Sequence, residues 1–270
     1  MLSRFFLPFS FIISALIYCP LYANEFYIKT GAAHNQTEYD EVDLGVNLNR
    51  ESGKANSFML ELGYQTRLWQ ISVSMAPQKG RLDYLGQTQS GIQKSTKSDI
   101  SRNHYTLRLR RLISSDKLDW YVLGGLASVK VNRDIRSQAD VSGLYEVYNF
   151  TTFQLGTEFQ LPITDKNKLK FDLLFESALD GEMTVEFKNN QFDIGRVELT
   201  NFLSAKLGAE FIHEYSRSVN LSLGVGYKQE FIGKSKEASL YRLGRPAGQF
   251  YQPKREYKEI SLLAAIKYSF

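Results

Sequence analysis

The residues that could support catalysis are few in this 270-residue chain, and they are spread along it. Its three histidines are His34, His104 and His213. Acid–base catalysis by a histidine and a carboxylate needs the two side chains within hydrogen-bond reach of each other. The aspartates of the more polar segments have no histidine beside them in the chain: Asp83, Asp99, Asp180 and Asp193. We therefore expect no catalytic residue.

One further pair, His213 and Ser216, has the residue types of a base and a nucleophile. Residues three apart on an extended strand point to opposite faces, so we do not expect these side chains to meet. The sequence contains no cluster of metal ligands, phosphate-binding glycine loop or nucleophile elbow. It accordingly predicts neither a metal nor a cofactor, and it favours a protein without enzymatic activity.

The strongest chemical signal is a basic segment at residues 233–255. Acidic residues are few there, and Tyr241, Phe250 and Tyr251 add flat contact area. Arginine can grip phosphate or sulfate through two parallel hydrogen bonds. We therefore predict that this segment binds lipopolysaccharide phosphates or another polyanion, with an ordinary solvated loop as the alternative. The predicted binding residues, whose arginines we expect to face neither lipid nor the interior, are Lys234, Lys236, Arg242, Arg245, Lys254 and Arg255.

The elements that position these residues are strands, as the C-terminal segment 257–270 indicates. Alternate residues from Ile260 to Phe270 form a continuous apolar face, because side chains along a strand point to opposite sides in turn. A free terminal strand with such a face would promote aggregation in water. The pattern is explained if the sheet closes on itself and this face contacts lipid.

Similar alternation recurs along the chain, although in 118–132 it is too weak to show which residues face inward. The expected strands are 25–34, 57–65, 68–76, 103–113, 118–132, 144–161, 168–187, 194–213, 219–232 and 257–270. Tight connections alternate with longer ones, which are 35–56, 77–101, 133–143, 188–193 and 233–255. One-sided loop lengths and an even strand number are typical of outer-membrane barrels. We predict an all-β fold, a closed antiparallel transmembrane β-barrel of about ten strands with short periplasmic turns and longer extracellular loops.

The N-terminus has the features of a secretory signal peptide. A positive charge at Arg4 precedes the apolar run 5–18, which is too short to span a membrane as a helix, and Ala23 offers a cleavage site. We predict a signal peptide at 1–23 and a barrel at 24–270. The chain's one cysteine, Cys19, falls in the removed part, and the large Tyr18 before it argues against a lipoprotein site.

Composition narrows the class of protein further. The mean hydropathy is −0.30 and no long apolar run follows Ala23, which excludes a bundle of transmembrane helices. A net charge of +4 is too small to indicate nucleic-acid binding. The predicted inward positions carry charges of both signs, such as Lys29, Glu61, Lys170 and Glu210. Barrels of eight to ten strands are filled by side chains, so we expect a plugged lumen, with a narrow pore as the alternative.

The C-terminal segment also resembles the C-terminal signature of bacterial outer-membrane β-barrels, with Phe270 last and Tyr268 two residues before it. This resemblance implies that Tyr268 and Phe270 form an assembly signal for the barrel-assembly machinery. A ten-stranded barrel of this length looks like the omptins, which are surface proteases, and like ten-stranded surface adhesins. Omptins pair an Asp–His couple with two aspartates across the barrel mouth, and that pattern is absent here. The segment 211–216 loosely resembles the His/Ser arrangement of lipid A deacylases, but it falls at a predicted periplasmic turn.

We predict a monomeric integral protein of the bacterial outer membrane, exposed at the Gram-negative cell surface, with a non-enzymatic binding or structural role. Its expected partners are outer-membrane lipid, lipopolysaccharide and the barrel-assembly machinery, and nucleic acid is not among them. Two alternatives remain, an omptin-like or lipid-modifying surface hydrolase and a narrow passive channel. Carboxylates or a histidine pair converging in one distal pocket would favour the hydrolase, and a continuous water path would favour the channel.

Overall fold

The computed structural model describes residues 25–87, 93–115, 117–138, 142–189, 191–199 and 201–270. The predicted signal peptide, with Cys19, lies outside the described residues. Among the residues described, no helix is both long and apolar enough to cross a membrane. The strands are β1 (Glu25–Asp43), β2 (Val46–Gln65), β3 (Trp69–Gln87), β4 (Gln93–Ser115), β5 (Asp119–Ile135), β6 (Leu144–Thr164), β7 (Asn167–Phe187), β8 (Gly195–Glu198), β9 (Phe202–Ser216), β10 (Val219–Ile232), β11 (Ala238–Arg242), β12 (Arg245–Phe250) and β13 (Lys254–Ser269).

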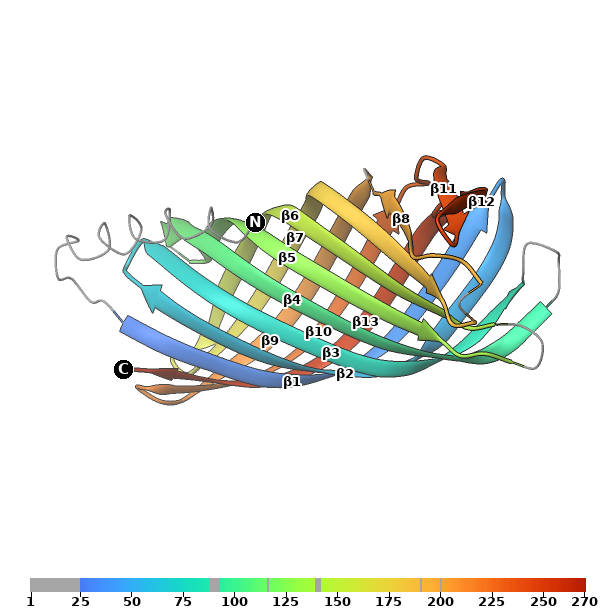
Figure 1. Ribbon diagram of the computed structural model, residues 1–270. Helices are drawn as coiled ribbons and strands as arrows, with labels where there is room; N and C mark the ends of the chain where they lie inside the picture. The colour runs from blue at the N-terminus through green and yellow to red at the C-terminus, as the bar shows by residue number, and fades with distance from the viewer. Residues whose placement is uncertain (1–24, 88–92, 116, 139–141, 190, 200) are drawn as a thin grey trace.

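Ten of these strands form one closed antiparallel barrel (Figure 1). Each strand from β1 to β7 pairs with the next, and β9, β10 and β13 continue the ring. The barrel closes where β1 pairs with β13, in a register that runs from Tyr27 opposite Ser269 to Val42 opposite Lys254. The predicted fold class is therefore confirmed, including the tight turns at the end where β1 begins and β13 ends.

The outer surface divides into two bands. Beside the tight turns it is covered by exposed apolar side chains, among them Val73, Leu126, Phe153, Leu207 and Leu262. A closed sheet satisfies all its backbone groups internally, and such an apolar band is the surface that lipid requires. Farther from the tight turns the outer surface becomes polar, which in β1 begins near His34. We call the apolar band the membrane half and the remainder the outer half.

Two predicted loops, 35–56 and 77–101, are barrel wall for most of their length, which corrects the expected strand bounds. β1 and β2 continue to a two-residue turn at Leu44 and Gly45, whose φ angles of 49° and 81° are those of a tight hairpin. The prediction failed because the alternation inverts above the lipid. In the outer half of β3 the apolar Leu82 is buried inside and the charged Arg81 is exposed outside. In the membrane half the apolar side chains, such as Val73, face outward instead.

The same inversion explains the weak pattern of 118–132. In β5, Leu126 is exposed to lipid, whereas Val129 and Val131 three and five residues later are buried inside the barrel. Odd-numbered residues therefore face inward along this strand. The predicted strand 194–213 is also corrected, because it is divided into β8 and β9, which pair with different parts of β7.

A hydrophobic core fills the outer half of the barrel on one side. It lies where β8 and the hairpin of β11 and β12 fold toward the barrel wall, at the end remote from the tight turns (Figure 1). Phe150 and Phe202 are in contact there, with ring centroids 4.7 Å apart. The buried residues of this core are Val129, Val131, Tyr148, Phe150, Met183, Val185, Val197, Leu199, Phe202, Ile232, Leu240 and Phe250.

Candidate functional site

The tip of the β11–β12 hairpin presents two arginines to solvent. Arg242 and Arg245 lie directly opposite each other in the strand register, and both are exposed. Between them, Leu243 and Gly244 have φ angles of 52° and 73°, which define a tight two-residue turn. The carboxylate of Asp193 accepts hydrogen bonds from the amides of Leu243 (3.2 Å) and Gly244 (2.9 Å). The turn is therefore anchored to the segment before β8.

Lys234 is held on the rim of the barrel. Its ammonium group pairs with Asp43 at 2.8 Å and lies 4.0 Å from the centre of the Tyr251 ring. The Tyr251 hydroxyl donates to the same carboxylate at 2.5 Å. These two hydrogen bonds, from Lys234 and then Tyr251, lower the pKa of Asp43. They tether the start of the predicted basic loop to the β1–β2 turn, while Lys236 and Lys254 stay exposed.

Arg255 is not a surface residue, and its predicted placement was wrong. It is 3% exposed and its guanidinium lies between the rings of Tyr39 (4.4 Å) and Tyr148 (4.5 Å). The cause is that β13 already begins at Lys254, so residues 254 and 255 belong to a strand whose odd positions face inward. Arg255 cannot contact a polyanion outside the barrel.

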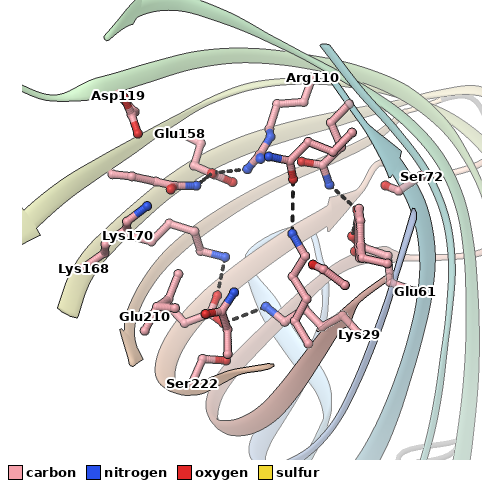
Figure 2. Close-up of a pocket in the computed structure, with 18 of the residues that line it drawn as sticks. Lys29, Glu61, Ser72, Arg110, Asp119, Glu158, Lys168, Lys170, Glu210 and Ser222 are labelled. Carbon is pink, nitrogen blue, oxygen red and sulfur yellow. Dashed lines mark hydrogen bonds and ion pairs between the residues drawn. The ribbon is translucent and has the colours of Figure 1, made fainter. Parts of the chain in front are cut away.

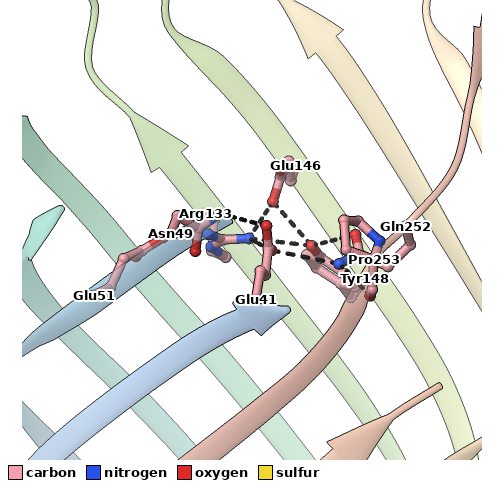
Figure 3. A network of polar contacts seen from close by, with 8 residues as sticks. All are labelled: Glu41, Asn49, Glu51, Arg133, Glu146, Tyr148, Gln252 and Pro253. Carbon is pink, nitrogen blue, oxygen red and sulfur yellow. Dashed lines mark hydrogen bonds and ion pairs between the residues drawn. The ribbon is translucent and has the colours of Figure 1, made fainter. Parts of the chain in front are cut away.

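Beside Arg255, a buried polar network crosses the lumen (Figure 3). The fully buried guanidinium of Arg133 on β5 donates to Glu41 (2.8 Å), Glu51 and Glu146 (2.6 Å), which come from β1, β2 and β6. The Tyr148 hydroxyl donates to Glu146 at 2.9 Å and is 3.0 Å from the side-chain oxygen of Gln252. The network joins walls of the barrel that are far apart in the sequence.

The pKa values of Glu41 and Glu146 in this network are shifted in opposite directions. Burial raises the pKa of Glu146, and the charge of the adjacent Glu41 adds to this effect. Burial also opposes ionisation of Glu41, but Arg133 and Arg255 outweigh it and lower the pKa of that carboxyl. Arg133 and Arg255 place two positive charges among the three glutamates, which limits the cost of burying them.

A second layer lies between this network and the membrane half. Tyr39 and Tyr257 pack with ring centroids 4.5 Å apart, together with buried Leu82 and Ile100. Arg102 donates to both carboxylate oxygens of Glu230, with one of the two contacts at 2.8 Å. Lys228 pairs with the same carboxylate at 2.6 Å. The buried side chains of both layers lie in the lumen of the outer half.

Below them, a cavity of about 390 Å³ occupies the lumen of the membrane half (Figure 2). Its lining extends to the tight-turn residues Lys166 and Arg217, so it opens at the periplasmic end. Lys29 and Lys170 both pair with Glu210, and Arg110 pairs with Glu158. We call this cavity the vestibule.

Known structures share this architecture. The outer-membrane protease OmpT from Escherichia coli superposes with a TM-score of 0.66 at 10% identity, covering 94% of this chain and 99% of that one. The fold is that of an outer-membrane β-barrel. The translocator domain of the autotransporter NalP from Neisseria meningitidis gives 0.48 at 11% identity, covering 97% of this chain and 93% of that one. OprG from Pseudomonas aeruginosa gives 0.40 at 14% identity, covering 92% and 96%. No family model and no curated protein matches the sequence.

The aspartates considered for catalysis in this outer-membrane barrel are occupied in separate places. Asp83 pairs with Lys97, and Asp99 pairs with Arg81 (2.8 Å) and Arg136 (2.6 Å) on the outer wall. Asp180 accepts the Thr151 amide at 3.0 Å, and Asp193 holds the hairpin turn. These four carboxylates do not converge on one pocket.

The histidines are equally dispersed in the barrel. His34 contacts Asn56 at 2.8 Å on the outer surface, and His213 contacts Asn167 at 2.8 Å near the periplasmic end. His104 lies in the lumen, 3.4 Å from Glu176. His213 and Ser216 both lie at the tight-turn end of β9, remote from the outer mouth of the barrel.

The predicted assembly residues lie on the lipid-facing side of the barrel seam. Tyr268 and Phe270 are exposed, and their rings meet edge to face at 4.9 Å. The Phe270 amide donates to the Phe26 carbonyl at 2.9 Å, which extends the β1–β13 pairing to the last residue. Their recognition by assembly machinery remains a prediction.

Proposed function

We propose that this chain is a non-enzymatic surface protein of the outer membrane whose β11–β12 hairpin binds a phosphate- or sulfate-bearing polyanion. The observation that carries the proposal is the pair Arg242 and Arg245, exposed and directly opposite across an anchored turn. Like charges opposite each other on a hairpin destabilise it unless an anion lies between them. Each guanidinium can also bind phosphate or sulfate with two parallel hydrogen bonds.

Further positive charge lies along the same segment. Lys236 and Lys254 are exposed, and Lys234 is fixed on the rim by Asp43. Because the hairpin stands at the end remote from the membrane half (Figure 1), the ligand must extend beyond the membrane surface. Both the phosphorylated saccharide of lipopolysaccharide and a sulfated polysaccharide have this chemistry and reach.

The test compares the Arg242→Ser/Arg245→Ser double variant with the parent in binding to purified lipopolysaccharide and to heparin. We expect binding to weaken by about tenfold or more, since charge-assisted hydrogen bonds each contribute about 1.5–3 kcal/mol. The effect should be large at about 10 mM salt and small at about 1 M, where the screening length falls from about 30 Å to about 3 Å. If the double variant loses binding to lipopolysaccharide alone or to heparin alone, that polyanion is the one that the hairpin recognises.

The matched control is Lys130→Ser, which removes an exposed cation from the outer wall of β5 without touching the hairpin. Heat-modifiable migration on gels verifies that each variant is folded. Equal binding by the double variant and the parent at low salt would reject the hairpin as the binding site.

The two alternatives have less support. The likeness to a protease concerns the fold, and the aspartates and histidines named above lie apart. The vestibule is a partial path for a channel, but the side chains of the layers around Tyr257 and Arg133 lie in the lumen above it.

A further inference from the structure

The vestibule is a built cavity in the membrane half of the barrel, and its charges are unevenly distributed. Its lining contains eight cations and six carboxylates, so positive charge is in excess. The cations are Lys29, Arg108, Arg110, Lys166, Lys168, Lys170, Arg217 and Lys267, and the carboxylates are Glu25, Glu61, Asp119, Glu158, Glu210 and Glu214. Asp172 lies against Gly208 outside the lining, and counting it still leaves an excess of positive charge.

Lys267 and Arg108 are two cations of this lining without a carboxylate partner among the described residues. Lys267 is directly opposite Lys29 in the β1–β13 register. Lys29 pairs with Glu210, whereas Lys267 donates to the amide oxygen of Gln65 at 3.1 Å. Two lysines opposite each other repel, so the pair favours an anion in the space before them.

Arg108 is the second such cation. Its guanidinium donates to the amide oxygen of Gln154 at 3.3 Å, a weaker partner than a carboxylate. Within the described residues, Nε of Arg108 and Nε of Arg110 are buried without a hydrogen-bond partner. Buried donors left without acceptors are costly, so both guanidiniums keep donor capacity that the protein itself does not satisfy.

We propose that the vestibule is a binding site for a small phosphate-bearing solute that enters from the periplasm. The positive excess and the open donors select an anion, and a volume of about 390 Å³ admits one larger than inorganic phosphate. In this lining the Lys267 ammonium lies 4.1 Å from the centre of the Tyr27 ring, and the Arg110 guanidinium lies 4.2 Å from that of the Tyr121 ring. Because the side chains of the outer-half layers lie above the vestibule, the proposal is binding without transport.

The first test measures thermal stabilisation of the purified barrel in detergent by pyrophosphate, at ionic strength matched with chloride. We expect pyrophosphate to stabilise the parent, and Lys267→Gln or Arg108→Gln to weaken its apparent affinity by about tenfold, the loss of one charge-assisted contact. Lys130→Gln on the outer wall is the control and should bind as the parent does. Absence of stabilisation beyond that of chloride, or an equal loss in the control, overturns the proposal.

A second test detects the positive electrostatic potential in the cavity, and it can be made even if one charge variant fails to fold. Asn220 lines the vestibule directly opposite Lys267, and Asn220→Cys places a thiol there. An anionic methanethiosulfonate reagent should modify this thiol faster than a cationic one, and pyrophosphate should slow it. The preference should fall when Lys267→Gln is added. Equal rates for both reagents, with no protection, would show a cavity without anion selectivity. Because the hairpin shares no residue with this site, either proposal can fail alone.

Discussion

At the scale of single residues, the most consequential side chain is Arg133. It is completely buried and holds three carboxylates from three other strands, in the outer half of the barrel where no lipid supports the wall. A buried ion cluster gives little net stability over an apolar core, but removing one member leaves uncompensated buried charge. Its effect is therefore to make one arrangement of the outer half strongly preferred.

We predict that Arg133→Met lowers the free energy of unfolding by about 3–5 kcal/mol, because buried Glu51 loses its arginine partner and Glu41 keeps only the more distant charge of Arg255. Equilibrium unfolding of the barrel in lipid vesicles with urea measures the change. Adding Glu51→Gln to this variant should recover part of the loss.

Arg136→Met provides the comparison, since the ion pair of Arg136 with Asp99 is exposed. Its loss should cost at most about 1 kcal/mol. If both variants lost the same free energy of unfolding, the Arg133 network would contribute no more to stability than an exposed ion pair.

At the scale of elements, the hairpin of β11 and β12 is fixed by packing as well as by Asp193. Phe250 and Leu240 enter the hydrophobic core, while Arg242 and Arg245 at the other end remain in solvent. Phe250 fits because residue 195 is glycine, and a Cβ there would lie 2.5 Å from the end of the Phe250 ring. The hairpin is thus an amphipathic unit that presents its turn at a fixed position.

We predict that Phe250→Ala detaches the hairpin, since deleting a buried phenylalanine costs about 3–5 kcal/mol. Limited proteolysis of folded protein should then cut within 234–254 much faster than in the parent. Gly195→Ala should act in the same direction from the other side of the contact.

The control for the hairpin is Tyr241→Ala, because that side chain is 43% exposed and does not belong to the core. It should leave the cleavage rate nearly unchanged. Protection of the segment in both Phe250→Ala and Gly195→Ala would mean that hydrogen bonds alone hold the hairpin.

At the scale of the whole molecule, buried side chains occupy the lumen in the outer half of the barrel, and a cavity occupies it in the membrane half. In the outer half the hydrophobic core packs on one side, beside the Arg133 network and the Tyr39–Tyr257 layer. The vestibule then opens to the periplasm. The outer and inner ends are therefore chemically separate, and the two proposed sites are independent of each other.

We predict that the purified barrel gives no sustained ion conductance in planar lipid bilayers. Deletion of 238–250, replaced by a short linker, should also remain closed, because the layer of Tyr257 and Arg102 lies below the hairpin. Steady single-channel currents from the folded parent would contradict this prediction and support the channel alternative.

The sequence alone determined the class of fold, because lipid imposes a simple rule on every strand of the membrane half. Alternate residues such as Leu221 and Leu223 must be apolar and the others need not be, so the pattern is visible locally. The alternating lengths of the connections then gave the topology. The exposed Arg242 and Arg245 could also be predicted from the sequence, because a cluster of basic residues in one segment is visible without knowing the tertiary contacts.

The tertiary structure decided everything that depends on which strand lies beside which. Above the lipid the exterior is polar, and the interior combines apolar side chains such as Leu82 with charged ones such as Arg133. The lipid-type alternation is therefore lost there, and the extended walls of β1 to β4 resembled loops in the sequence. Arg255 could not be placed for the same reason, because it joins Tyr39 and Tyr148 only across the closed barrel. The Arg133 network and the vestibule likewise combine residues from strands that meet only when the sheet closes.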